Sequence, residues 1–126
     1  MTYFFDNNIS PRLVNILREL DVDALHLKQV FPENTDDVDW IPRAGQEGRI
    51  VITADREIRR NTAERAALRQ NNVTALFLQR AFLKRTKWPQ AEWLIKHWLK
   101  IDAQAQKLRQ GTTMLISDNG KLISLD

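Results

Sequence analysis

The chain has 126 residues, of which 43% are hydrophobic and 28% charged, and its formal net charge is +3. This length suits one domain, residues 1–126, with a substantial core, and it is too short for two domains. The absence of cysteine excludes disulfides and thiolate metal sites. No stretch approaches the roughly 18 apolar residues that a membrane span needs, so we expect a cytoplasmic protein with no membrane partner.

The first predicted elements form a β-α-β unit. Residues 3–5 are aromatic and predict a buried strand that ends at Asp6. Ser10 followed by Pro11 predicts the start of a helix, because serine caps helices and proline suits the first helical position. Residues 24–31 are expected to form a second strand. If the two strands are parallel in one sheet, their crossover should be right-handed.

The rest of the chain predicts alternating helices and strands with an antiparallel end. Thr35 or Asp36 caps a short helix that ends at Gly45 or Gly48. A continuous apolar run, as in Ile50-Val51-Ile52, is typical of a strand covered on both faces of a parallel sheet. The expected elements are a strand at 49–53, a helix at 63–70, a strand at 73–78, a helix at 87–108, and a hairpin of strands 112–116 and 121–125 around Asp118-Asn119-Gly120. The sequence therefore predicts one α/β domain with an antiparallel tail.

Three acidic residues are expected at one edge of this sheet. Asp6 and Asp55 follow two buried strands, and Asp37 opens the short helix between them. If the first and third strands are neighbours, the two strand-end acids converge. Clustered carboxylates without histidine or cysteine suit Mg²⁺ or Mn²⁺ rather than zinc. The alternative interpretation is that each aspartate forms a turn or caps a helix.

The chain resembles the compact PIN-like proteins of bacteria and archaea in three segments, which are Phe5-Asp6-Asn7-Asn8-Ile9-Ser10-Pro11-Arg12-Leu13, Asp37-Val38-Asp39-Trp40-Ile41 with Ala44, and Arg49-Ile50-Val51-Ile52-Thr53-Ala54-Asp55. The resemblance covers roughly the first 60 residues. It implies a three-layer α/β/α sandwich with a mostly parallel sheet and a metal-dependent ribonuclease, often the toxin of a VapC-type toxin–antitoxin (VapBC) pair with a small antitoxin partner.

The resemblance also implies roles for individual residues. Asp6, Asp37 and Asp55 match the catalytic, metal-binding acids of the family, and Glu57 stands where a further acid is usual. Asn7 replaces a frequent acid after the first aspartate. Asp36 and Asp39 are substitutes if the register of the acidic segment differs. The metal would activate a water for attack on the phosphodiester.

Basic and aromatic side chains suggest where RNA would bind. The residues expected to contact substrate are Asn8, Ser10, Arg12, Arg56, Arg59 and Arg60. A wider basic surface is expected from Arg65, Arg69, Arg80, Lys84, Arg85 and Lys87. Trp40 and Trp88 are candidates for base stacking, although four tryptophans in so short a chain more often indicate core or partner contacts. Trp93 is a candidate for an interface with an antitoxin or a second copy. His26 and His97 are interpreted as structural.

Two other functions remain open. One is a catalytically silent domain that binds nucleic acid or protein, which Asn7 and Glu57 support. The other is a receiver-type phosphoacceptor module, which also places acids after its first and third strands. Such a module expects two adjacent acids after the first strand, whereas here Asn7 follows Asp6. Fold alone does not decide among these functions.

Overall fold

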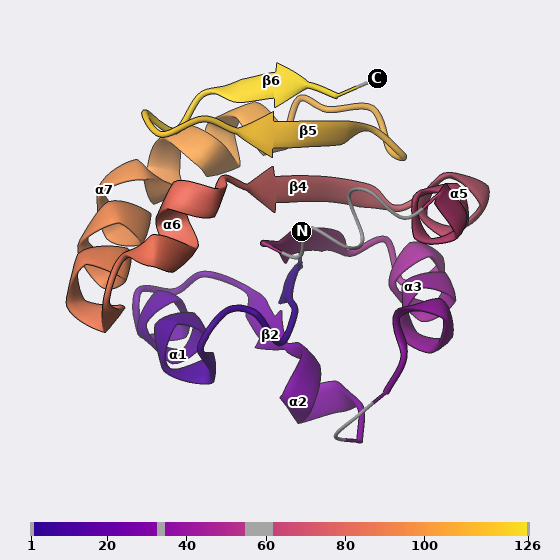
Figure 1. The fold of residues 1–126 in the computed structure, drawn as a ribbon, viewed down its shortest axis with the longest axis horizontal. Helices are drawn as coiled ribbons and strands as arrows, with labels where there is room; N and C mark the ends of the chain where they lie inside the picture. The colour runs from indigo at the N-terminus through magenta and orange to yellow at the C-terminus, as the bar shows by residue number, and fades with distance from the viewer. Residues whose placement is uncertain (1, 33–34, 55–61, 126) are drawn as a thin grey trace.

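The computed structural model describes residues 2–32, 35–54 and 62–125, and their strands form one six-stranded sheet (Figure 1). The strand order is β2-β1-β3-β4-β5-β6. All neighbouring pairs are parallel except β5 and β6, which are antiparallel as the sequence predicts. The strands are β1 (Tyr3–Phe5), β2 (Ala24–His26), β3 (Ile50–Thr53), β4 (Thr74–Leu78), β5 (Thr113–Ile116) and β6 (Leu122–Ser124).

Helices cover both faces of the sheet. The described helices are α1 (Pro11–Glu19), α2 (Leu27–Val30), α3 (Asp37–Gln46), α5 (Thr62–Gln70), α6 (Arg80–Lys84) and α7 (Lys87–Ala105). In Figure 1, α1, α6 and α7 gather on one side of the sheet, and α3 and α5 lie on the other. The predicted mixed fold with a mostly parallel sheet is therefore confirmed.

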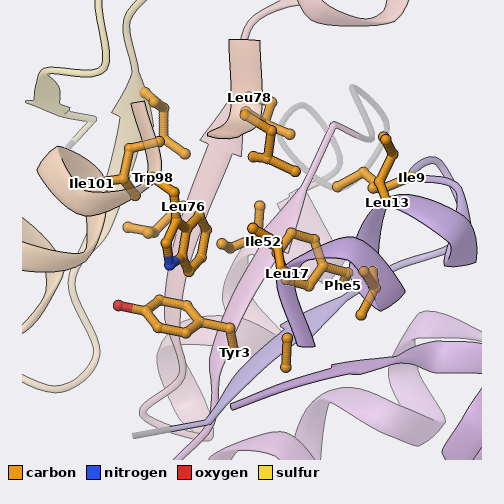
Figure 2. Close-up of a cluster of buried hydrophobic side chains, with 14 of the residues drawn as sticks. Tyr3, Phe5, Ile9, Leu13, Leu17, Ile52, Leu76, Leu78, Trp98 and Ile101 are labelled. Atoms are coloured by element: carbon orange, nitrogen blue, oxygen red, sulfur yellow. The ribbon is translucent and has the colours of Figure 1, made fainter. Parts of the chain in front are cut away.

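Alternate strand residues enter two separate cores, one on each face of the sheet. Tyr3 and Phe5 pack with residues of α1 and α7, and Figure 2 shows the Tyr3 ring against Trp98. The two ring centroids are 4.7 Å apart in an edge-to-face arrangement. Phe4 points to the opposite face and packs against Trp40 of α3. Every residue of β1 is thus buried, which explains the uninterrupted apolar run.

Local signals fix the start of α1 and the end of α3. The Ser10 hydroxyl accepts a hydrogen bond from the Arg12 amide at 3.2 Å, and Pro11 is the first residue of α1. The α3 helix starts after Asp36, and Gly48 follows it with a φ of 65°. That left-handed conformation carries little strain only for glycine. The predicted cap at Ser10 and the glycine stop at Gly48 are confirmed, whereas Asp36 occupies the N-cap position of α3 without a side-chain capping bond.

The predicted strand at 24–31 is wrong in its second half. The strand β2 ends at His26, and α2 begins at the next residue. The His26 Nδ1 accepts a hydrogen bond from the Lys28 amide at 3.1 Å, while the Gln29 side chain accepts one from the His26 amide at 2.9 Å. This reciprocal cap starts a helix, and histidine is not among the residues that usually signal one.

Two other helices differ from what the sequence predicts. The short helix α6 was not predicted, because five residues are too few to show a helical period. The long helix α7 has 19 residues and ends at Ala105 rather than Leu108. Within the described part of the chain, no helix combines the length and apolar character needed to cross a bilayer.

Two tryptophans have different surroundings from those expected. Trp40 is fully buried, so the prediction that it stacks on bases is wrong. Trp93 is only 8% exposed, and its indole N–H donates to the Asp118 carbonyl at 2.8 Å. The interface predicted for Trp93 is therefore wrong as well. Trp88, at the start of α7, is 77% exposed.

A close contact between Gly45 of α3 and Asn71, the residue after α5, gives a stability prediction. A Cβ atom added at Gly45 would lie 2.1 Å from the Asn71 backbone carbonyl oxygen. Because a carbonyl cannot move without its chain, Gly45→Ala should lower the free energy of unfolding by about 1–3 kcal/mol. Urea denaturation measures this change. Gln46→Ala, at an exposed position of the same helix, is the control and should unfold at the wild-type urea concentration.

Candidate active site

The pairing of β1 with β3 places two polar residues side by side at one edge of the sheet. Phe5 is the register partner of Ile52, so Asp6 and Thr53 are the next residues along the two strands. The Asp6 amide continues the ladder by donating to the Ile52 carbonyl at 3.3 Å. We call this the carboxyl edge, where parallel strands β1 to β5 end. In open α/β sheets, ligands bind at this edge.

The Asp6 side chain is buried and held from two directions. It is 3% exposed. Its Oδ1 accepts a hydrogen bond from the Asn8 amide at 3.1 Å, and its Oδ2 accepts one from the Thr53 hydroxyl. A buried carboxyl group without such donors would be strongly destabilising. These two bonds therefore fix the orientation of Asp6 at the carboxyl edge.

Thr53 is a site residue that the sequence analysis did not identify. It is fully buried at the end of β3, and its hydroxyl reaches the neighbouring strand. The available signal was a hydroxyl side chain inside an otherwise apolar strand, because buried hydroxyls need a hydrogen-bond partner. The identity of that partner depends on strand order, which the sequence alone does not give.

A buried histidine supports the loop that follows Asp6. His26 is fully buried, and its Nε2 lies 2.6 Å from the Ile9 carbonyl oxygen. Since Nδ1 accepts the Lys28 amide proton, Nε2 is the nitrogen that donates to Ile9. The Ile9 amide in turn donates to the Asp6 carbonyl at 3.2 Å. Burial lowers the pKa of His26, although the bond to Ile9 opposes that shift. The prediction that His26 is structural is therefore confirmed, and its role is to hold the loop after Asp6.

The other predicted metal ligands are only partly covered by the described residues. Asp37 is the first residue of α3, and Asp39 is exposed on the same helix. Asp55, Arg56, Glu57, Arg59 and Arg60 lie outside the described residues. Among the residues that the structure describes, no group of three or more acids and histidines gathers at metal-binding distance. The cluster of Asp6, Asp37 and Asp55 remains a prediction.

The chemistry of the carboxyl edge fits a hard divalent cation. Asp6 presents oxygen atoms, and β3, its neighbour, leads to Asp55 two residues after Thr53. A carboxylate has about four lone-pair positions, so the bonds from Asn8 and Thr53 are compatible with a metal contact. Mg²⁺ and Mn²⁺ prefer such ligands.

Several predicted substrate-binding residues surround this edge. Asn8 and Arg12 are exposed, and Ser10 caps α1 between them. Arg80, Lys84 and Lys87 are exposed beyond the end of β4.

One member of the predicted basic surface has a structural role instead. Arg85 is half-buried and forms an ion pair with Asp118 at 2.7 Å. Its guanidinium also lies 5.9 Å from the centre of the Trp93 ring. Arg85 therefore connects α6 to the hairpin turn.

These features define an α/β protein with an acidic residue fixed at the carboxyl edge of a parallel sheet. A family model described as a PIN-like domain matches residues 1–80, which include β1 to β4. The chain belongs to the PIN-like domain family, and the predicted resemblance is confirmed at this level. No curated protein and no solved structure matches the chain. PIN-like domains are commonly nucleases.

The bond from Thr53 to Asp6 can be tested by removing the hydroxyl. Thr53→Val keeps the shape of the side chain but leaves the buried Asp6 carboxyl group without that donor. We expect the free energy of unfolding to fall by about 1–3 kcal/mol, measured by urea denaturation. Thr53→Ser retains a hydroxyl and should recover part of the loss. Wild-type stability of the valine variant would contradict this role.

The buried neutral His26 predicts that stability declines on acidification. Burial lowers its pKa in the folded protein below the value of about 6.5 that is usual for histidine, so the unfolded chain binds a proton first as pH falls. The free energy of unfolding should therefore decrease as pH falls through about 6.5 toward the lower pKa of the folded state, by at most about 1.4 kcal/mol per pH unit for one proton. Urea denaturation at a series of pH values measures this slope.

A variant of each histidine separates their contributions to the pH dependence of stability. His26→Gln can still donate to the Ile9 carbonyl and should remove its part of the slope. Burial also lowers the pKa of His97, so His97→Gln should remove a separate part. An unchanged slope in His26→Gln would show that His26 is not the responsible group.

Proposed function

We propose that this chain is a metal-dependent endoribonuclease that hydrolyses RNA phosphodiester bonds. The observation that carries the proposal is the buried Asp6, fixed by Thr53 and the Asn8 amide at the carboxyl edge. Membership of the PIN-like domain family supports it. The strand next to Asp6 leads directly to Asp55, the second acid expected to contribute.

The side chains would divide the work between holding a metal and holding RNA. Asp6, Asp37 and Asp55, with Glu57, would bind Mg²⁺ or Mn²⁺. When bound, such an ion lowers the pKa of a coordinated water and offsets negative charge that develops on the phosphate. Thr53 and the Asn8 amide would keep Asp6 in one orientation, so that little reorganisation is needed during the reaction.

The RNA backbone would lie across the basic residues near this edge. Arg12 is exposed at the start of α1, close in sequence to Asp6. Arg56, Arg59 and Arg60, with Asn8 and Ser10, would complete the substrate-binding set. Contacts of this kind neutralise phosphates, so RNA binding should weaken steeply as salt concentration rises.

The finer proposal is a toxin of the VapC type. The resemblance of the first 60 residues supports it. In that case a small antitoxin protein would bind the chain and suppress RNA cleavage. A second copy of the chain is the other proposed partner, in a homodimer. Production without the antitoxin would arrest growth, and Asp6→Asn would relieve the arrest.

A second candidate is a catalytically silent PIN-like domain that binds nucleic acid or protein. The observation that favours it is that both Asp6 oxygens accept bonds from the protein itself. A buried aspartate with this arrangement can serve to shape a turn. Asn7, which takes the place of a frequent acid, points in the same direction.

Substitution of Asp6 separates the two candidates. Asp6→Asn keeps the size of the side chain but removes its charge, so we expect Mn²⁺-dependent cleavage of labelled RNA to fall by more than the 10- to 100-fold typical of groups that only support a metal ligand. Excess EDTA should abolish wild-type cleavage. Calorimetry should show weaker Mn²⁺ binding by the variant, with its thermal unfolding still cooperative.

The matched control is Asp21→Asn, at an exposed turn where φ is 66°. Asparagine tolerates that conformation, so cleavage should remain at the wild-type rate. Wild-type protein that neither binds Mn²⁺ nor cleaves varied RNAs would favour the silent domain.

A further inference from the structure

A hollow of about 330 Å³ lies between α1 and the start of α7. Trp88 forms part of its wall, together with apolar side chains of both helices such as Ile16 and Ile95. Arg12 and Lys87 also line it, as does Glu92. Figure 1 shows α1 and α7 on the same side of the sheet. We call this hollow the Trp88 pocket.

We propose that the Trp88 pocket is a subsite for single-stranded RNA, in which a base stacks on the Trp88 indole. The proposal rests on the proposed function, because RNA is the substrate that function requires. The pocket would be a second place for the substrate, apart from Asp6, and Trp88 would be the residue that contacts the base there.

The exposure of Trp88 is the first argument. The chain has four tryptophans, and the other three are at most 8% exposed. Trp88 is 77% exposed, so most of this residue remains available for an external contact. Aromatic rings that present an open face bind unpaired bases of any sequence, because every base has a π-face.

The position of the pocket is the second argument. Ser10 lies in its wall, only four residues after Asp6. Four residues span at most about 14 Å when fully extended. The chain between them is also turned, because the Ile9 amide donates to the Asp6 carbonyl. An RNA strand that crosses Asp6 would therefore reach the pocket within a few nucleotides.

The charges around the pocket are the third argument. Arg12 and Lys87 are exposed, and no ion pair ties either of them to the part of the chain that the structure describes. They suit the phosphates on either side of a stacked base. Glu92 repels phosphate, so it favours a base rather than the backbone in its part of the pocket. Its carboxylate can also accept a hydrogen bond from an amino group of a base.

Apolar side chains continue along the two helices away from this charged end. Leu20 and Leu99 line a second hollow of about 280 Å³, and they are 57% and 81% exposed. An apolar strip of this kind also suits a helix of a protein partner or a second copy. The cations and the exposed indole lie at the end next to Asp6, which favours RNA as the occupant of the Trp88 pocket. Leu99 then provides a matched control.

The test measures binding of a fluorescein-labelled, single-stranded 12-nucleotide RNA of mixed sequence to the full chain by fluorescence anisotropy. Excess EDTA prevents cleavage. Trp88→Ala should weaken binding by about 5- to 150-fold, the range that loss of one stacked base implies. Trp88→Phe keeps an aromatic face and should recover most of the affinity. Leu99→Ala should bind RNA as the wild type does.

The cations give an independent readout. Arg12→Gln and Lys87→Gln should each weaken RNA binding at low salt. Each should also reduce the slope of log K against log salt concentration by about one, as expected for the loss of one phosphate contact. A lost stacking contact should leave that slope nearly unchanged, so Trp88→Ala and the two glutamine variants should differ in this respect.

Wild-type affinity of Trp88→Ala, or no binding of this RNA by the wild type, would overturn the proposal. Equal loss of RNA binding in Trp88→Ala and Leu99→Ala would also overturn it. So would a change in self-association caused by Trp88→Ala without a change in RNA affinity, since it would assign the pocket to a protein contact. Size-exclusion chromatography measures that association.

The outcome separates this subsite from the proposed function. Trp88-dependent RNA binding by a wild-type protein that shows no Mn²⁺-dependent cleavage would remove the ribonuclease proposal and keep the subsite. Cleavage with the same KM in wild type and Trp88→Ala, together with equal RNA affinity, would remove the subsite and keep the ribonuclease proposal.

Discussion

The parallel pairing of β1 with β3 is the constraint on which the rest of the site depends. Their register makes Asp6 and Thr53 neighbours, and the hydroxyl of one strand then satisfies the carboxyl group of the other. A shift of one residue would turn Phe5 and its neighbours to the wrong faces of the sheet. Since the two faces have separate cores, such a shift would disrupt both. The packing that stabilises the sheet therefore also sets the position of Asp6.

Much of this fold is predictable from local sequence, because its strands are covered on both faces. Continuous apolar runs indicated β1, β3 and β4, and Ser10 with Pro11 marked the start of α1. Some errors have local causes, such as the His26 cap that starts α2, but others arose where distant residues decide the outcome. Trp93 packs in the core beside Phe82, and its indole N–H donates to the Asp118 carbonyl, 25 residues away in the chain. No local pattern contains that contact.

The site was predictable to a smaller extent. Asp6 could be identified because an acid directly after a buried strand is unusual for packing and common at ligand sites. Thr53 and His26 were not assigned to the site because each acts through a partner on another element. The His26 Nε2 connects the end of β2 to the Ile9 carbonyl after β1, and its Nδ1 caps the start of α2. In the sequence His26 is an isolated histidine. Only the strand order shows that it supports the loop after Asp6.

The structure also changes where a polyanion would be bound. The sequence suggested a broad basic surface after the third and fourth strands, but Arg85 is engaged by Asp118 and Trp93. Arg12 and Lys87 come from different helices and meet at one pocket beside an exposed indole. Two cations and an aromatic face can hold both components of a nucleotide, whereas scattered cations attract only the backbone. This arrangement is the reason for the proposal that the chain binds unpaired bases, and not only a phosphate backbone.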